Sequence, residues 1–553
     1  MIGQASPGFG PFNMPWLLDL FVAIILALWL GAAFAIVRLL REEPDARREL
    51  WGLTAWAFAL VAWRGLIPAH FFASVSASFP DHTSKIGLGW PSLVAALSHL
   101  APRTDLVSFG AARLCGVLTG PVAYTTLRRL SGDRRVALLG AGLLVALPFQ
   151  IMLAIGDDAH PAALLLFLAG MSHFTDYART GQRRAFALAA PCLVLMVHTR
   201  LETGFLLFSI LALVAQPKAF AALLRRDARM LSMAGIATVV FTQAAISSDM
   251  ERCLPYPPPA AVLREAINAV TLFPAMGDHF TKDMLLGVVP DFETTNFDDI
   301  SWVPIALLPL LWSGWGMLLS SKAGWRMLLA VLIARVPGYA YLGVAGTDYL
   351  GSRHFVGVLP LLCMVTAVGA VAIGERLRFV ALPVALGFAA LFFVESRAPL
   401  RFRFAFQEEY TFLRRAIATL PENASIAHLP FEFGLSPAES SLRLRRPDIL
   451  WSDFNREDSP NTRFAYLGPD CDALQRTDIE GSTHGYLHPD ERLALLTHLR
   501  ERCQSFTRLP TRRVLLRGTV SRHGHGPPIT EGPRLPVALI ELDPMPDAVP
   551  DAR

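Results

Sequence analysis

The chain has 553 residues, of which 53% are hydrophobic and 17% are charged, and its mean hydropathy is +0.40. This composition excludes an ordinary soluble globular protein, which carries more charged side chains on its surface. The formal net charge of +4 does not predict binding to nucleic acid. The basic residues stand mostly in short turns between apolar segments and form no basic amphipathic face.

Apolar segments of about 20 residues recur up to residue 395, and segments of this length cross a bilayer as helices. They predict about twelve transmembrane helices, with both chain ends on the outer side. The first segment lacks a basic leader and a small-residue cleavage site, so we expect a retained anchor and not a removed signal peptide. The predicted spans are 16–40, 51–67, 108–127, 136–154, 161–178, 185–199, 203–222, 230–247, 301–320, 327–345, 354–373 and 379–395.

The connections between these spans fall into two sets. The short, arginine-rich set contains 41–47, 128–135, 179–184, 225–229, 322–326 and 376–378. The other set carries the acidic and histidine residues and contains 68–107, 157–160, 249–300 and 348–354. Positively charged connections stay in the cytoplasm. The sequence therefore predicts a multi-pass membrane protein whose second set of connections is extracytoplasmic.

The composition becomes polar and charged from about Arg401. We therefore predict a membrane domain, 1–399, with outer loops 68–107 and 249–300, an extracytoplasmic α/β domain, 400–543, and a disordered tail, 544–553. The fold class is mainly α. Within the second domain, the patterns predict helices at 406–420 and 489–503 and strands at 425–429, 463–467, 513–516 and 537–542. Cys471 and Cys503 are a plausible disulfide there, since an oxidising compartment permits one.

Asp81 follows Pro80 in the first outer loop, with His82 and Lys85 close behind it. A carboxylate in this place can accept the proton of an incoming hydroxyl, as a general base does. The alternative is that Asp81 caps the following turn or helix, which is the commoner role of a lone aspartate after proline. His82 and Lys85 would then bind phosphate or simply be solvated at the interface.

Asp157, Asp158 and His160 follow an apolar segment at its outer end. Two adjacent carboxylates and a histidine can bind a divalent metal or the hydroxyls of a sugar. Equally, one carboxylate can cap the helix that Pro161 begins. The sequence does not decide between these two interpretations.

Two further groups stand at the outer ends of spans. Arg200 and Glu202 are ionisable residues at a depth where such groups face a cavity or each other. They are two residues apart, so they would not share a face of a continuous helix. Arg353 and His354 precede another span, where the guanidinium can bind a phosphate through two hydrogen bonds or can anchor the helix at the interface.

Several motifs are missing from the sequence. It contains no phosphate-binding glycine loop, no dinucleotide fingerprint, no GxSxG elbow and no HExxH metal motif. The energy for any reaction would therefore come from an activated substrate and not from a bound nucleotide.

The order of the candidate residues along the chain, from Asp81 through Asp157, Asp158 and Arg200 to Arg353, resembles the GT-C superfamily of polytopic glycosyltransferases, which use polyprenyl-phosphate sugars. The stretch that begins at Arg353 and reaches Pro360 is similar to the family's Arg-Tyr-x-x-x-x-x-Pro stretch, with His354 in place of the tyrosine. The residues that carry the resemblance are Asp81, Arg113, 128–134, 146–148, Asp157, Asp158, 177–181, 199–202, 351–355 and 359–360.

The resemblance implies an inverting transfer of a sugar from a lipid-linked phosphate to an acceptor at the outer face. Asp81 would be the catalytic base, with Asp157 or Asp158 assisting acceptor or metal binding. Arg353 and Arg200 would hold the phosphate. The substrate would also contact His82, Lys85, His160, Glu202 and His354. No cofactor is assigned, except that a divalent metal at Asp81 and Asp158 stays open. The implied partners are the donor lipid, the bilayer and an acceptor of unknown identity, without nucleic acid.

Two other classes of protein compete with this interpretation. A lipid or saccharide transporter would need charged residues near the bilayer midplane and broken helices along a path. A non-catalytic assembly or sensor protein would use the C-terminal domain to bind a partner and would tolerate loss of the outer acids.

Overall fold

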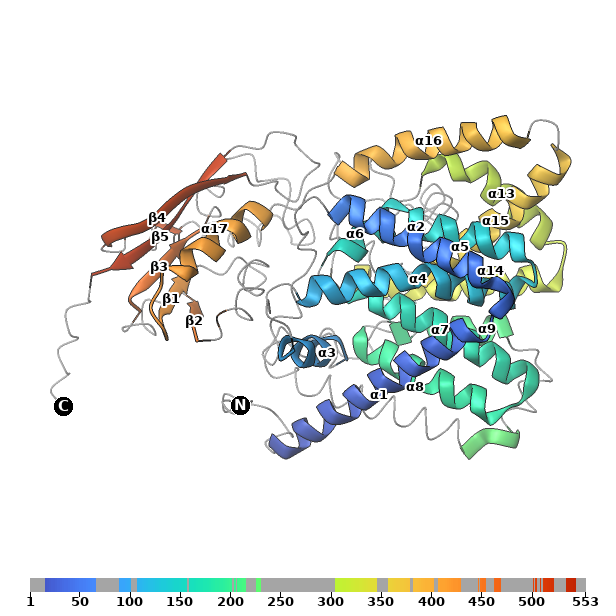
Figure 1. The fold of residues 1–553 in the computed structure, drawn as a ribbon, viewed down its shortest axis with the longest axis horizontal. Helices are drawn as coiled ribbons and strands as arrows, with labels where there is room; N and C mark the ends of the chain where they lie inside the picture. The colour runs from blue at the N-terminus through green and yellow to red at the C-terminus, as the bar shows by residue number, and fades with distance from the viewer. Residues whose placement is uncertain are drawn as a thin grey trace.

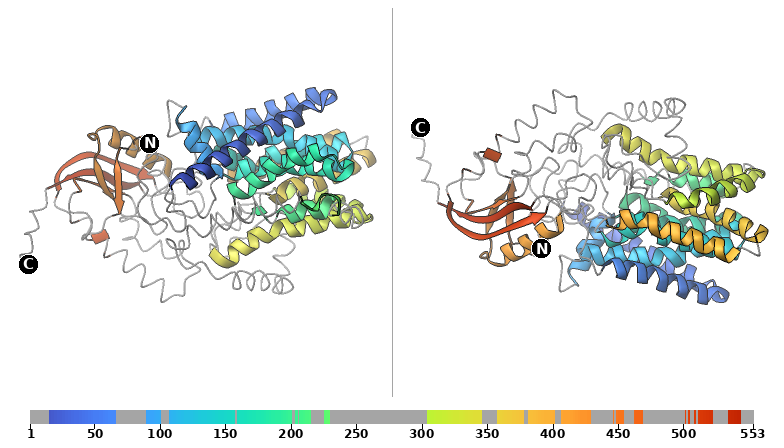
Figure 2. Two further views of the ribbon diagram at one scale, coloured as in Figure 1. Left: turned by 90° about the horizontal axis from the view of Figure 1, so that it is seen from below. Right: turned by 90° about the horizontal axis from the view of Figure 1, so that it is seen from above.

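A computed structural model shows a bundle of helices followed by a mixed β-sheet that lies beyond one end of the bundle (Figures 1 and 2). The residues that the structure describes are 15–65, 89–100, 107–156, 159–200, 203–204, 206–214, 225–229, 304–345, 357–377, 381–401, 406–428, 446, 448–453, 462–468, 501, 503–504, 508, 511–521 and 534–543. The predicted tail and most of the two predicted outer loops lie outside these ranges.

The described part of the chain is mainly helical up to Arg401, as the sequence predicted. The helices are α1 Pro15–Arg41, α2 Arg47–Gly65, α3 Gly89–Ser98, α4 Val107–Ser131, α5 Arg134–Ala146, α6 Pro148–Ile155, α7 His160–Thr180, α8 Arg183–Thr199, α9 Leu206–Val214, α13 Leu308–Leu318, α14 Lys322–Ala345, α15 Leu359–Arg376, α16 Ala381–Arg401 and α17 Phe406–Ala418. Two short 3₁₀ turns, Pro44–Ala46 and Ile305–Leu307, precede α2 and α13.

Two of the described helices are long and apolar enough to cross a membrane by themselves, at Val22–Arg41 and Leu359–Arg376. A third span is counted if α5 and α6, which meet at a bend of 60°, cross together. The bundle also exposes large apolar side chains that water would not favour; Leu30, Trp51 and Leu382 are each more than 70% exposed. These features support a membrane environment, while the number of twelve spans remains a prediction.

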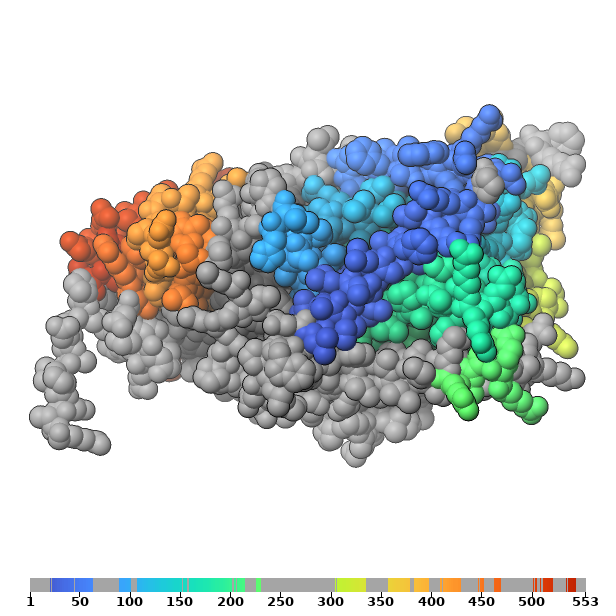
Figure 3. Space-filling model, turned by 60° about the horizontal axis from the view of Figure 1, so that its bottom comes forward, coloured from blue at the N-terminus to red at the C-terminus, as the bar shows by residue number. Residues whose placement is uncertain are grey.

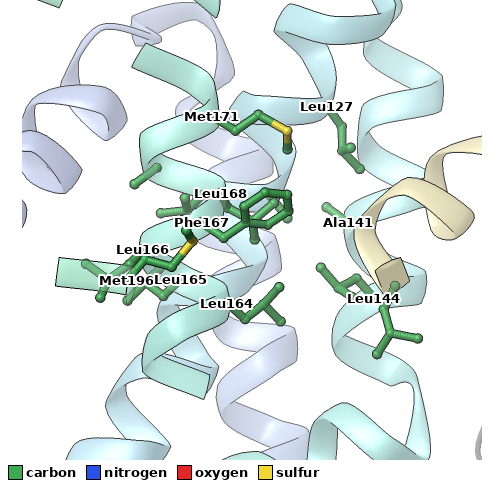
Figure 4. Packing of buried hydrophobic residues seen from close by; sticks show 14 of the residues in the cluster. Leu127, Ala141, Leu144, Leu164, Leu165, Leu166, Phe167, Leu168, Met171 and Met196 are labelled. Atoms are coloured by element: carbon green, nitrogen blue, oxygen red, sulfur yellow. The ribbon is translucent and has the colours of Figure 1, made fainter. Parts of the chain in front are cut away.

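The centre of the bundle is α7, which α4, α8 and their neighbours enclose (Figure 4). Every side chain from His160 to Thr175 on this helix is buried. Phe167 and Met171 pack toward Leu127 of α4 and Ala141 of α5. A helix that is apolar all round its circumference belongs in the interior of a bundle, so α7 fixes the positions of the helices around it.

Ion pairs gather at the end of the bundle that lies away from the sheet. Arg128 contacts Glu43 at 2.7 Å, and Arg129 contacts Glu42 at 3.2 Å and also Asp176. The remaining pairs at this end are Arg38–Glu42, Arg134–Glu49 and Arg135–Glu375. These contacts join the C-terminal ends of α1, α4, α7 and α15 to the starts of α2 and α5. The arginine-rich turns of the sequence therefore meet at one end, which we call the charged end.

The sheet has the strand order β2-β1-β3-β5-β4. Its strands are β1 Ser425–His428, β2 Leu450–Asp453, β3 Phe464–Leu467, β4 Thr511–Ser521 and β5 Arg534–Leu542. The pairs β1–β2 and β1–β3 are parallel, whereas β3–β5 and β4–β5 are antiparallel. The apolar face of α17 packs on one side of the sheet, where Phe412 lies near Tyr466. The Tyr466 hydroxyl donates a hydrogen bond of 2.6 Å to the buried Glu409.

One arginine joins the end of α17 to the start of β2. The Arg446 guanidinium donates two hydrogen bonds of 2.7 Å to the Asp448 carboxylate and one of 3.0 Å to the carbonyl of Ile417. It thereby satisfies a carbonyl that the last turn of the helix leaves open. The hydrogen bonds from Arg446, helped by the backbone N–H of Asn423, lower the pKa of Asp448 to about 2.

This contact predicts a loss of stability in acid. The folded-state pKa of Asp448 lies below its ordinary value, so its contribution is complete above about pH 4 and is lost as the pH falls through about 2. Asp448→Asn should raise hydrogen exchange of the β1 and β2 amides at pH 5 and flatten its dependence on pH below that. The matched control is Asp543→Asn, an exposed carboxylate after β5, which should leave the profile as in the wild type. Identical profiles for both variants would refute the role of the pair.

Candidate functional site

Two of the predicted site residues, His160 and Arg200, lie in the described part of the chain. Both are buried, with 1% and 4% of their surface exposed. The other predicted site residues lie outside the described residues; they are Asp81, His82, Lys85, Asp157, Asp158, Glu202, Arg353 and His354. Their roles remain predictions.

The antiparallel hairpin of α7 and α8 brings His160 and Arg200 to the same end of the bundle. His160 is the first residue of α7, and Arg200 directly follows α8. The helices turn at Gly181, whose left-handed φ of +70° suits a glycine at a helix C-terminus. Since the two helices have similar lengths, the residues before α7 and after α8 lie opposite each other. This is the end of the bundle that faces the sheet.

The residues around Arg200 form a tight local structure. The Thr203 hydroxyl donates hydrogen bonds to the carbonyl of Arg200 at 2.6 Å and to that of Met196 at 3.0 Å. These bonds satisfy carbonyls at the end of α8. His198 and Thr199, just before Arg200, are also buried. We call His160, His198, Thr199, Arg200 and Thr203 the polar end.

Two other segments pack closely beside the polar end. A Cβ atom on Gly89, at the start of α3, would lie only 2.8 Å from the backbone of His198 and Thr199. The Trp29 indole of α1 holds the same glycine through a hydrogen bond of 2.9 Å to its carbonyl. A Cβ atom on Gly357, before α15, would lie 2.6 Å from the Leu206 side chain. Glycine at both positions allows α3 and the start of α15 to approach this closely.

Several polar groups in this half of the molecule are buried, and the sequence patterns did not single out those of Trp90, Ser92 and Gln150. The Trp90 Nε1, the Ser92 Oγ and the Thr199 Oγ1 are buried and have no hydrogen-bond partner among the described residues. The same holds for both amide atoms of Gln150 on α6 and for the Arg113 Nε on α4. Such groups are uncommon in folded proteins because each costs free energy. Gln150 was detectable in the sequence as the polar residue of an apolar segment.

The C-terminal domain meets the bundle through Phe109, near the start of α4. Its side chain is 2% exposed and belongs to the same cluster of buried hydrophobic residues as Phe412, Ile426 and Leu539. α17 and the sheet therefore pack against the end of the bundle at which α4 begins. Figure 1 shows this end facing the sheet, opposite the charged end.

Cysteine chemistry bears on which side of the membrane this domain occupies. Cys503 forms a disulfide bond, whereas Cys115, Cys192 and Cys363 are free and buried. Its predicted partner, Cys471, lies outside the described residues, so the pairing remains a prediction. Disulfide bonds persist in oxidising compartments, and the extracytoplasmic location of the domain remains a prediction.

The metal prediction remains open. Within the described ranges, no three or more His, Cys, Asp or Glu side chains lie together as metal ligands would. Asp81 and Asp158, the predicted ligands, are outside those ranges.

Comparison with known proteins finds similarity among solved structures. No family model matches the chain, and no curated protein matches it. Among solved structures, the chain is similar to the crystal structure of ArnT from Cupriavidus metallidurans bound to undecaprenyl phosphate, with 12% identity and a TM-score of 0.39. The alignment covers 90% of this chain and 98% of that one. A similarity at this TM-score carries no argument about function.

Proposed function

We propose that the protein is an integral membrane glycosyltransferase that moves a sugar from a polyprenyl-phosphate donor to an acceptor hydroxyl at the outer face. The observation that carries the proposal is the polar end. Histidine and arginine side chains are buried there beside apolar helices, at the end of the bundle where the C-terminal domain packs. Ionisable groups buried at the end of a membrane bundle are costly, and they are usually functional.

The proposal is also supported by the short stretches of chain that link Asp158 and Arg353 to residues at or beside the polar end. Asp158 is two residues from His160, so the extended chain separates them by at most about 7 Å. Arg353 is four residues from Gly357 and thus within about 14 Å of it, and Gly357 packs on Leu206 beside the polar end. The Asp158 carboxylate and the Arg353 guanidinium are therefore both linked to the polar end by a few residues of chain. A longer stretch of chain links Asp81 to Gly89, which packs against the polar end.

The proposed reaction is a single displacement at the anomeric carbon. The bond from this carbon to the phosphate oxygen breaks, and the electron pair leaves with the polyprenyl phosphate. Arg200 and Arg353 stabilise the charge on that phosphate. The acceptor oxygen forms the new bond from the opposite face of the sugar, and its proton passes to Asp81. Apolar surface beside the site would hold the polyprenyl chain, which explains why the site lies at a membrane surface.

Binding of undecaprenyl phosphate to the purified protein tests the phosphate subsite. Arg200→Gln and Arg353→Gln should each weaken binding by about ten- to a hundredfold, since charged hydrogen bonds are worth about 1.5–3 kcal/mol. Binding of undecaprenol, which lacks the phosphate, should stay as in the wild type. The matched control is Arg376→Gln, an arginine at the charged end. The assignment fails if the Arg200 and Arg353 variants bind undecaprenyl phosphate as tightly as the control.

A further inference from the structure

Exposed arginines gather on two segments at the charged end that are far apart in the sequence. One segment is the turn between α7 and α8, and the other is the short helical segment 225–229. Both lie at the end of the molecule opposite the sheet, where 225–229 is at the surface (Figure 3, light green). The arginine patch consists of Arg179, Arg183, Arg184, Arg225, Arg226 and Arg229, all of which are exposed.

A single buried aspartate holds the two segments together. Asp227 accepts a hydrogen bond of 2.7 Å from the Tyr177 hydroxyl of α7 and one of 3.2 Å from the Arg183 Nε of α8. The Arg226 Nε donates to the same carboxylate at 2.7 Å, and its guanidinium lies over the Tyr177 ring. These hydrogen bonds, the one from Tyr177 first, lower the pKa of Asp227. The ionised carboxylate therefore fixes the geometry of the patch, although it neutralises little of its charge.

The turn between α4 and α5 provides a contrast at the same end. It also carries four arginines, but each of them pairs with a carboxylate, from Glu42, Glu43, Glu49, Asp176 or Glu375. On the arginine patch, Arg179, Arg184, Arg225 and Arg229 form no ion pair with a carboxylate in the part of the chain that the structure describes. Among the described residues, Asp227 and Asp176, which acts on Arg179 and also pairs with Arg129, are the carboxylates near these six arginines. The patch therefore carries an excess of positive charge.

We propose that the arginine patch binds the phosphate headgroups of anionic phospholipids in the membrane leaflet at the charged end. The patch stands at the C-terminal end of α7 and the N-terminal end of α8. The predicted spans 161–178 and 185–199 end there, and this topology would place the guanidinium groups at headgroup depth. Guanidinium groups bind phosphate oxygens through two parallel hydrogen bonds. Clusters of four or more basic residues beside a membrane helix bind anionic lipids. The apolar residues Phe220, Leu223 and Leu224 directly precede the second segment, a composition suited to the interface.

The test compares phospholipids retained by the purified full-length protein in native mass spectrometry. The probes are dioleoyl phosphatidylglycerol and dioleoyl phosphatidylcholine at equal concentration. The wild type should retain the anionic lipid at least tenfold more than the zwitterionic one. The quadruple variant Arg179→Gln, Arg184→Gln, Arg225→Gln and Arg229→Gln should lose most of this preference, because each basic residue near the surface contributes separately. All four side chains are exposed, so the variant should fold.

The matched control removes the same charge from other turns at this end. It combines Arg41→Gln, Lys322→Gln, Arg326→Gln and Arg376→Gln, and it should keep the preference within about twofold of the wild type. Formation of the Cys503 disulfide in both variants verifies that the orientation in the membrane is unchanged. The proposal is overturned if both variants lose the preference equally, if neither loses it, or if inorganic phosphate displaces the lipid at millimolar concentration.

Discussion

Replacing Asp81 with Asn is expected to abolish sugar transfer while the amount of protein in the membrane stays normal. A general base contributes about a hundred- to ten-thousandfold to a reaction of this class, and asparagine cannot accept the proton of the acceptor hydroxyl. The loss should appear in kcat and not in the affinity for the donor, because Asp81 is assigned to the proton and not to the phosphate. Asp81→Glu, which keeps the carboxylate, should retain part of the activity.

Transfer can be measured before the acceptor is known. Membranes that contain the protein are incubated with a panel of polyprenyl-phosphate hexoses and pentoses, and mass spectrometry follows the release of polyprenyl phosphate. The control is Asp105→Asn, a carboxylate of the same predicted outer loop, which should transfer at the wild-type rate. Undiminished release by the Asp81 variant would remove Asp81 from the mechanism. A transporter would release no polyprenyl phosphate in any variant, because it leaves the bond to the sugar intact.

Much of the helical arrangement could be predicted from apolar length and the position of arginine-rich turns. The break at Leu147 and Pro148 was not predicted, since a segment of unbroken hydropathy spans it. α6 bends away there because proline cannot continue the hydrogen bonding of the preceding helix. Four of the five strands overlap the predicted ones, whereas β2 was missed. Its four residues, Leu450–Asp453, are too few to show an alternation of apolar and polar side chains.

The site could be predicted only in part, for a physical reason. Arg200 and His160 could be singled out because ionisable residues beside apolar segments are unusual; the structure shows that both are buried, and their roles remain predictions. The contributions of Gly89 and Gly357 were not, because a close approach between segments depends on tertiary packing and leaves no local pattern. The same is true of Asp227, which binds Tyr177 across 50 residues of sequence. From the sequence, the surrounding arginines were expected to determine topology, whereas the structure gathers them into one patch.

Phe109→Ala is expected to release the C-terminal domain from the bundle. Truncation of a buried phenylalanine costs about 3–5 kcal/mol. Phe109 lies on α4 but belongs to the cluster of buried side chains that includes Phe412 and Leu539, so most of this free energy should be lost from the contact between the two parts. The sheet and α17 should stay folded, because their own cluster of apolar side chains remains.

Limited proteolysis between α16 and α17 measures this release. Cleavage within 402–405 should become at least tenfold faster in Phe109→Ala than in the wild type, while hydrogen exchange of the β5 amides should change little. The control is Phe208→Ala on α9, a phenylalanine that is 58% exposed and lies outside the cluster; it should be cleaved at the wild-type rate.

Unchanged cleavage in Phe109→Ala would show that other contacts hold the domain. Faster exchange in β5 would mean instead that Phe109 stabilises the sheet itself. Release without unfolding, accompanied by loss of transfer, would make the position of the domain over the polar end a requirement of the reaction.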